Sequence, residues 1–370
     1  MPGIYIHIPF CKAKCRYCDF TSYPGKIGLS DAYMACMIRE MQLRAKDLEK
    51  YEFGTVYFGG GTPSVVDPKW IVGCMNEIRK EYKLADGAEV TLELNPGTVD
   101  AEKIAAYKYA GVNRFSVGLQ SANDKLLRDI GRIHTAKDFE AACSLLKGEN
   151  FNADIMIGLK GQTLDDIKNS IALAARCGAS HISVYALTPE EGTPIYTEEY
   201  LNGDLPDQDE VADMYAQSVG ILAEHGYKRY EVSNFAKPGF ESRHNMNYWK
   251  RGEYIGFGAS ASSFMAGRRF TNTPDLDEYT KCILSGHYPV VDDEKISEKD
   301  ARFEKVMLAL RTADGLDIAE YRSDFGSEFV VDFFDALSKN KEYFDFDGRR
   351  VRIKDEFLYV QNQILCDFIE

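Results

Sequence analysis

The chain of 370 residues lacks several features that would assign it to other classes of protein. It has no apolar run of ~18 residues, so we expect no helix that crosses a membrane. Its N-terminus, MPGIYIHIPF, lacks the basic start and long apolar stretch of a signal peptide. Basic residues are in the minority, and the net charge of −14 argues against binding nucleic acid or anionic lipid by charge alone. We therefore expect a cytoplasmic protein that meets a membrane only peripherally, if at all.

Paired cysteine spacing is also missing. Six of the nine cysteines are scattered singly, which does not form a disulfide framework and fits a reducing compartment. The other three, Cys11, Cys15 and Cys18, lie within eight residues in the spacing C-x3-C-x2-C. This cluster needs a chemical explanation.

Three candidate explanations follow from the donor set. Structural zinc takes four ligands, and the fourth would have to be His7 or a distant group. An iron–sulfur cluster normally takes four thiolates as well, but three thiolates on a four-iron cube leave one iron open to a small molecule. Three structural thiols without any metal are the remaining alternative.

Apolar strand-like runs alternate with helix-like stretches over the first 226 residues. The runs are GIYIHIPF, GTVYFGGG, EVTLELNPG, RFSVGLQS, ADIMIGLKG and HISVYALTPE, and the helical patterns cover roughly 30–50, 68–83, 100–110, 136–148, 164–177 and 207–226. Helix-start signals occur at Ser30-Asp31, Asp67-Pro68 and Thr163 with Asp166. The alternation predicts an α/β fold of parallel strands, either a barrel or a doubly wound sheet.

The pattern changes after residue 227. YKRYEVSNFA predicts a last strand, and the Gly- and Ser-rich stretch YIGFGASASSF follows it. Beyond about 280 the sequence predicts two or three helices and a hairpin that turns at Asp347-Gly348. Acidic residues outnumber basic ones there, which opposes DNA binding. We divide the chain into a barrel over 1–240, a connecting segment over 241–280 and a smaller α+β domain over 281–370.

The cysteine spacing resembles the signature of the radical S-adenosylmethionine (SAM) family. The resemblance implies a partial (β/α)6 barrel whose three cysteines hold a [4Fe–4S] cluster. It further implies that the amino and carboxylate groups of SAM chelate the open iron, and that an electron from the reduced cluster cleaves SAM.

Further motifs agree with this family. Glu93, Gln120 and Asp154 each lie in or at the end of an apolar run, and α/β barrels place their sites at the carboxyl ends of strands. Any one of them alone is also compatible with a helix cap or a solvated rim position. FGGGTPS resembles the loop that meets the methionine part of SAM. The SAM-binding residues implied by the resemblance are Tyr5, Tyr17, Gly60, Gly61, Thr62, Glu93, Gln120, Arg132 and Asp154.

Within the family the chain resembles the oxygen-independent coproporphyrinogen III oxidase group from residue 4 to at least 260. It departs from the oxidase at Phe20, where the oxidase pattern has a further cysteine, and in having no room for an extension before Ile4. RHNMNYW resembles instead the H-N-x2-Y-W signature of the HemW haem chaperones. The haem-binding candidates are then His244, Asn245, Tyr248 and Trp249. Arg243, Lys250 and Arg251 are candidates for the haem propionates, and a packed turn is the structural alternative for the motif.

The resemblance predicts a haem chaperone of the HemW type that binds a [4Fe–4S] cluster, SAM and haem as cargo. Its partners would be haem or another porphyrin, haem-accepting proteins and an electron donor, with no nucleic acid, and it would be a monomer or a dimer. We assign no catalytic residue. Two alternatives remain: a radical-SAM enzyme acting on a porphyrin, such as coproporphyrinogen III dehydrogenase, and a non-catalytic metal scaffold.

Overall fold

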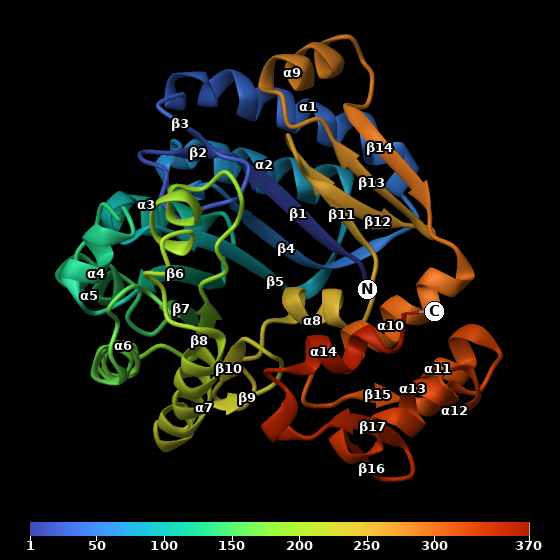
Figure 1. The fold of residues 1–370 in the computed structure, drawn as a ribbon. Coiled ribbons are helices and arrows are strands. Elements are labelled where there is room, and N and C mark those ends of the chain that lie inside the picture. The colour runs from blue at the N-terminus through green and yellow to red at the C-terminus, as the bar shows by residue number, and fades with distance from the viewer. Residues whose placement is uncertain (370) are drawn as a thin grey trace.

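A twelve-stranded mixed sheet curves through the computed structural model, which describes residues 1–369 (Figure 1). Six strands follow one another in sequence and in space, and all neighbouring pairs among them are parallel. They are β1 (Gly3–Ile8), β4 (Glu52–Gly60), β5 (Lys83–Leu94), β6 (Arg114–Gln120), β7 (Phe151–Ile157) and β8 (His181–Ala186). The predicted (β/α)6 arrangement is therefore confirmed.

Helices connect these strands on the outside of the curve (Figure 1), and apolar periodicity predicted all of them except the short α4. They are α1 (Ser30–Leu48), α2 (Pro68–Glu81), α3 (Ala101–Tyr109), α4 (Asp124–Asp129), α5 (Ala136–Leu145), α6 (Leu164–Arg176) and α7 (Gln208–Glu224). Asp67 caps α2, and Thr163 forms a capping box with Asp166 at α6, as expected. The signal at Ser30 was wrong in detail, because Leu29 is the N-cap residue of α1 and makes no side-chain cap.

Both edges of the six-stranded unit are extended by later parts of the chain. On one edge β11 (Tyr254–Phe257) pairs parallel with β1, and β12 (Ser262–Met265), β13 (Arg268–Asn272) and β14 (Val290–Lys295) continue antiparallel. On the other edge the expected single strand is two short ones, β9 (Lys228–Arg229) and β10 (Asn234–Ala236), and β10 runs antiparallel to β8. Helix α8 (Arg243–Trp249) precedes β11, and α9 (Leu276–Leu284) follows β13.

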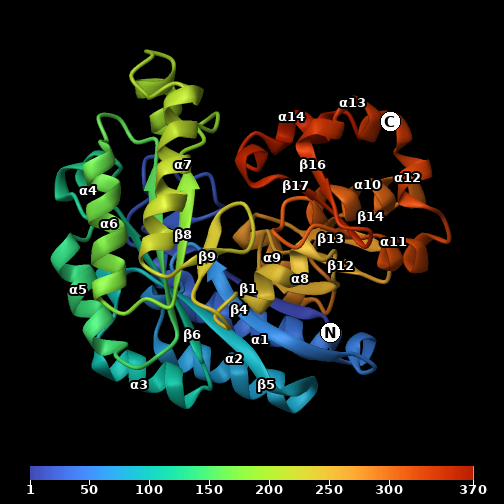
Figure 2. The ribbon, with the colours of Figure 1, turned by 90° about the horizontal axis from the view of Figure 1, so that it is seen from below.

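The C-terminal part has a hydrophobic cluster of its own, built from residues between 306 and 368. It lies to one side of the barrel (Figure 2). The hairpin of β16 (Phe344–Phe346) and β17 (Arg350–Ile353) is antiparallel around Asp347-Gly348, as predicted, and β15 (Leu316–Asp317) pairs with β17. The number of helices was underestimated: α10 (Glu298–Ala309), α11 (Ile318–Phe325), α12 (Phe329–Asp332), α13 (Phe334–Lys339) and α14 (Gln361–Cys366).

Backbone hydrogen bonds join this part to the barrel. Val232 N–H donates to the carbonyl of Arg311 at 3.1 Å, and Ala313 N–H donates to the carbonyl of Tyr230 at 2.9 Å. The division at residues 240 and 280 into separately folding units stays a prediction. No helix among residues 1–369 is long and apolar enough to cross a membrane.

Candidate cluster and cofactor site

The three clustered cysteines lie on the loop that follows β1, at the carboxyl end of the parallel strands. A short parallel pair fixes both ends of this loop: β2 (Phe10–Cys11) pairs with β3 (Tyr23–Pro24). Cys11 is 8% exposed, whereas Cys15 and Cys18 are partly exposed. The loop therefore presents three thiols from a backbone that is anchored on both sides.

A cation and a hydroxyl lie close to two of the thiols. Arg132 Nη1 lies 3.6 Å from Cys15 Sγ, and Cys11 Sγ lies 3.5 Å from Thr62 Oγ1. Burial raises the pKa of Cys11 and of Cys18. Arg132 opposes that effect at Cys11, because a nearby positive charge favours a thiolate and lowers its pKa. Tyr17 also contacts Arg132 and Cys15, so two of the predicted SAM residues lie beside the cysteines.

The glycine loop Gly59–Gly61 lies directly against the cysteine loop. Gly61 N–H donates to the carbonyl of Ile8 at 2.9 Å, and a Cβ at Gly61 would lie 3.0 Å from Cys11 Sγ. Gly60 has φ +114°, and a Cβ there would meet the ring of His7 at 2.8 Å. From the sequence we expected glycines here because they let the backbone approach a ligand closely. The structure shows another reason for glycine, the close packing of the glycine loop on the cysteine loop, which holds Cys11 in place.

Two carboxyl groups from β5 and β7, the strands on either side of β6, interact in the barrel interior. Tyr57 Oη donates to Glu93 Oε1 at 2.8 Å, and Ser116 Oγ donates to Asp154 Oδ2 at 3.0 Å. Burial raises the pKa of Glu93 to about 7, and the hydrogen bond from Tyr57 lowers it only in part. Burial also raises the pKa of Asp154. Both groups lie in the barrel interior, where opposite charge or a donor from a ligand would stabilise them.

Gln120 closes β6 with an unusual backbone. Its φ is +65°, and the pairing register of β6 with β7 shifts between Gly118 and Gln120. A left-handed non-glycine residue beside a bulge is a strained arrangement that redirects a side chain at the end of a strand. Arg132 reaches the same strand end, because its Nη2 donates to the carbonyl of Gly118 at 2.9 Å. Arg132 therefore joins β6 to the cysteine loop.

The donor set fits a cluster with one ligand per iron better than a single-ion site. Within residues 1–369 no group of three or more His, Cys, Asp or Glu side chains surrounds one metal ion. A four-iron cube instead takes each thiolate at a different iron, which suits three thiols spaced along one loop.

The HNxxYW helix, α8, lies against the other end of the barrel interior. His244 is 1% exposed, and its Nδ1 lies 2.7 Å from Thr55 Oγ1 while its Nε2 lies 2.9 Å from Tyr248 Oη. Its ring stacks on Tyr57 with centroids 4.9 Å apart. Burial lowers the pKa of His244 to about 3, so the ring is neutral.

The backbone around His244 is equally fixed. Glu89 accepts hydrogen bonds from the backbone N–H of Arg243 at 3.0 Å and of His244 at 2.9 Å. Arg243 itself donates to the carbonyls of Gly54 and Gly87. Arg243, expected to be available to propionates, thus holds α8 to β4 and β5. Asn245 and Trp249 are partly buried on the same helix.

Sequence reasoning missed a buried arginine in the barrel interior. Arg114 is 2% exposed, and its buried Nε has no hydrogen-bond partner among residues 1–369, while its positive charge lowers the pKa of the buried Asp154. Thr91 stands next to it in the β5–β6 register, and the Thr91 hydroxyl is also buried without a partner. The surrounding polar groups are paired with one another: His181 bonds Asn152 at 2.7 Å and Tyr230 at 2.8 Å. The sequence did contain a signal for it: an arginine at the start of a predicted strand in which polar and apolar residues alternate.

A cavity of about 520 Å³ connects the two motifs. It is lined by Tyr5 and His7 of β1, by Phe20 and Thr21 of the cysteine loop, by Tyr248 of the HNxxYW helix, and further on by Arg251, Gly252, Tyr254, Ser260, Ser262, Phe264, Arg269 and Leu308. Of the four haem candidates, only Tyr248 belongs to this lining. Phe20, which replaces the oxidase cysteine, is 70% exposed and belongs to it as well. The volume of this cavity is within the usual range of small-molecule sites.

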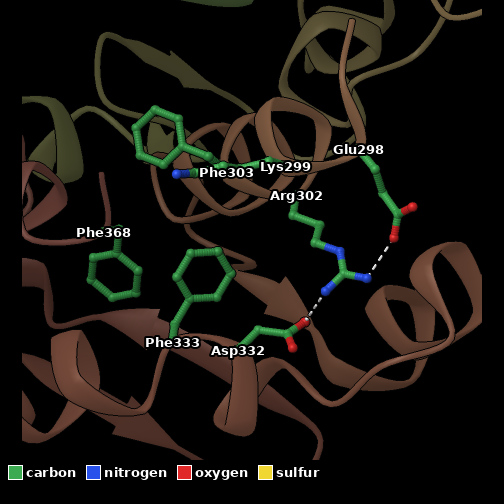
Figure 3. A pocket seen from close by; sticks show the side chains of 7 residues that line it. All are labelled: Glu298, Lys299, Arg302, Phe303, Asp332, Phe333 and Phe368. Carbon is green, nitrogen blue, oxygen red and sulfur yellow. Dashed lines mark hydrogen bonds and ion pairs between the residues drawn. The ribbon is translucent and has the colours of Figure 1, made fainter. Parts of the chain in front are cut away.

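A second cavity of about 380 Å³ lies within the C-terminal part (Figure 3). Arg302 extends between Glu298 and Asp332, with N–O distances of 2.5 and 3.0 Å. Phe303, Phe333 and Phe368 lie around it. Its arginine is therefore already paired with two carboxylates of the same domain.

Comparison with known proteins agrees with the motifs and the fold. Residues 5–174 match the Radical SAM superfamily. The coproporphyrinogen III oxidase HemN from Escherichia coli, a radical SAM enzyme, has the same fold: the TM-score is 0.87 at 19% identity, covering 100% of this chain and 90% of that chain. Fold and cysteine loop together define the class, a HemN-like radical SAM protein.

Curated relatives narrow this class. The chain is 36% identical over 332 residues to the heme chaperone HemW of Bacillus subtilis, covering 88% of this chain and 87% of the relative. It is 33% identical to HemW of Lactococcus lactis, covering 99% and 96%. Identity to HemW of Escherichia coli is 34%, covering 86% and 85%. The chain belongs to the HemW family of radical SAM proteins, a superfamily that implies a [4Fe–4S] cluster and SAM.

Proposed function

We propose that this protein is a haem chaperone, which receives haem in the 520 Å³ cavity and passes it to haem-dependent proteins. The observation that carries the proposal is that this one cavity is lined by Tyr248 of HNxxYW and by Phe20 and Thr21, which follow the third cysteine on the cysteine loop. The names of the curated relatives support haem as the cargo.

At the cofactor end we assign Cys11, Cys15 and Cys18 to the cluster. Gly60, Gly61 and Thr62 would hold the methionine part of SAM, with Tyr5 and Tyr17 flanking it, and Glu93, Gln120, Arg132 and Asp154 would bind its charged and ribose groups. When bound, cluster and SAM supply one-electron chemistry. The chain's own contribution is to hold the thiolates, with Arg132 stabilising their negative charge at 3.6 Å from Cys15.

At the cargo end the cavity offers aromatic faces to a flat porphyrin. Phe20, Tyr248 and Phe264 line it from three different elements. Axial ligation of the haem iron by His244 stays a prediction, and it requires a change in the position of Tyr248. Its Nε2 is bonded to Tyr248 Oη, and Tyr248 lines the cavity, so Tyr248 must turn away before iron can reach that nitrogen.

Anaerobic reconstitution followed by separate titrations with SAM, haem and coproporphyrinogen III tests the proposal. We expect SAM and haem to bind, Phe20→Ala and Tyr248→Ala to weaken haem at least tenfold, and the cluster content to stay unchanged. Phe240→Ala is the matched control, because Phe240 is an exposed phenylalanine outside the cavity lining. Haem affinity that is equal in all three variants would contradict the cavity assignment.

A second candidate, coproporphyrinogen III dehydrogenase, is favoured by the shared fold with HemN. It predicts protoporphyrinogen formation by the reduced, SAM-loaded protein over many turnovers. We expect none, because Phe20 stands where the oxidase pattern has a cysteine. Steady product formation would replace the chaperone proposal by this one. We propose haem-accepting proteins and an electron donor as partners, and we name no particular protein for either.

A further inference from the structure

The wall of the 520 Å³ cavity contains two arginines that share one carboxylate. Arg251 Nε lies 2.8 Å from Glu304 Oε2, and Arg269 Nη1 lies 2.9 Å from Glu304 Oε1. Both arginines line the cavity. The group therefore has an excess of one positive charge at a wall that a ligand would touch.

The two guanidiniums are held on the same aromatic ring. The Arg251 guanidinium carbon lies 4.6 Å from the ring centroid of Phe264, and that of Arg269 lies 5.7 Å from it. Phe264 lines the cavity too. Arg251 also has a left-handed backbone, φ +56°, which is strained for a residue with a side chain. Ring and backbone fix the arginines in position, so little side-chain freedom is lost when they bind a carboxylate.

Glu304 comes from a different part of the molecule. It lies on α10, which packs against α8, and Leu308 one turn further along α10 lines the same cavity. The side chain of Glu304 is 15% exposed and that of Arg251 17%, so the pair is partly shielded from water and stronger than a surface pair. The C-terminal part thus contributes Leu308 to the cavity lining and the Glu304 carboxylate to the two arginines that line it.

We propose that Arg251 and Arg269 receive the two carboxylates of the porphyrin cargo, and that Glu304 competes with those carboxylates for the same guanidiniums. The inference rests on the proposed function and adds how the cavity keeps haem releasable. A carrier must give up its cargo, and an internal carboxylate lowers affinity for a dianionic ligand without changing the aromatic contacts. No covalent step is involved, since one carboxylate replaces another at each arginine.

The chemistry distinguishes this role from simple packing. Removing the negative charge of Glu304 should strengthen binding only of ligands that carry carboxylates. Haem and its dimethyl ester share the ring and the iron, but the ester has no free carboxylate. The ester therefore reports the aromatic cavity alone.

The experiment titrates both ligands into wild-type protein and into Glu304→Gln, which keeps the shape of the side chain. We expect Glu304→Gln to bind haem about three- to tenfold more tightly and the ester unchanged. The control is Asp293→Asn, which removes an exposed Arg268–Asp293 pair of similar length (3.0 Å) on the neighbouring strands β13 and β14, outside the cavity lining. It should change neither affinity.

A second variant tests the arginines. Arg251→Met with Arg269→Met should weaken haem about tenfold or more, down to the affinity of the ester, while ester binding persists as proof of a folded cavity. Equal haem affinity in wild type and Glu304→Gln, or equal tightening of haem and ester, would overturn the inference and leave the haem proposal standing. Failure of wild type to bind either ligand would overturn both.

Discussion

The two ends of the barrel interior differ in how their polar groups are satisfied. At the carboxyl end of the strands, Arg132 lies beside a thiol, and burial raises the pKa of Glu93 to about 7 despite its hydrogen bond from Tyr57, so among residues 1–369 neither charge is balanced by an opposite charge of an ion pair. At the opposite end, His244 has both ring nitrogens bonded and Glu89 accepts two backbone N–H groups. The same fold therefore leaves the cysteine motif accessible to ligands and buries the HNxxYW motif as part of its structure.

The difference shows that a short sequence motif does not by itself reveal whether it binds a ligand or supports the fold. C-x3-C-x2-C lies on an anchored loop with two partly exposed thiols. HNxxYW lies on a helix whose histidine is 1% exposed, and only its tyrosine faces the cavity. Four variants would sharpen or break this comparison.

The largest effect is expected at the cysteine loop. Cys15→Ala should abolish the absorption of the proposed [4Fe–4S] cluster and its reduced-state paramagnetic signal, because each of the three thiolates would hold a different iron. Cys36→Ala, a buried cysteine on α1, is the control and should retain both signals. A full iron complement in Cys15→Ala would break the assignment.

At the other end, His244→Ala should lower the free energy of unfolding by about 2–4 kcal/mol, because two buried hydrogen bonds and a stacked ring are lost. Urea denaturation of the variant measures this. His287→Ala is the control, because His287 is exposed. If His244→Ala left stability unchanged and shifted the haem spectrum, the motif would be a ligand set rather than a support.

Arg114 is the exception to the well-paired lower end. Arg114→Met should lower the free energy of unfolding by about 1–3 kcal/mol at neutral pH, because the buried Asp154 carboxyl loses the positive charge that lowers its pKa. Denaturation curves of variant and wild type test this, with Arg176→Met, an exposed arginine on α6, as control. A gain of stability would show that burying this guanidinium, whose Nε has no hydrogen-bond partner in the described part of the chain, costs more than its charge contributes.

The smallest effect depends on pH. Folding raises the pKa of Glu93 from its ordinary value of 4.5 to about 7, so the folded state binds more protons in that window and stability falls as pH rises through it. Glu93→Gln removes this titration. Its stability relative to wild type should therefore rise by about 1–3 kcal/mol between pH 4.5 and pH 8. Denaturation at several pH values, in one cluster state, measures the change, and a constant difference would contradict the buried, raised pKa.

Local patterns in the sequence were enough for the repeated strands and helices and for the cysteine loop. Apolar runs of β1, β4 and β5 are bounded by turn residues, and the thiol spacing is a property of eight consecutive residues. The caps at Asp67 and Thr163 act within three residues of chain. Such features are readable because the interacting groups are neighbours in sequence.

Tertiary structure alone decided which distant groups meet. Periodicity does not reveal that β11 joins β1, that Gly61 packs on Cys11, or that His244 is buried against Thr55. Arg269 lies eighteen residues after Arg251, and both reach Glu304 only because β13, the α8–β11 turn and α10 come together. The sequence determined which reactive and polar groups the chain carries. The long-range pairing of strands and helices determined which of these groups face a ligand and which form hydrogen bonds or ion pairs with one another.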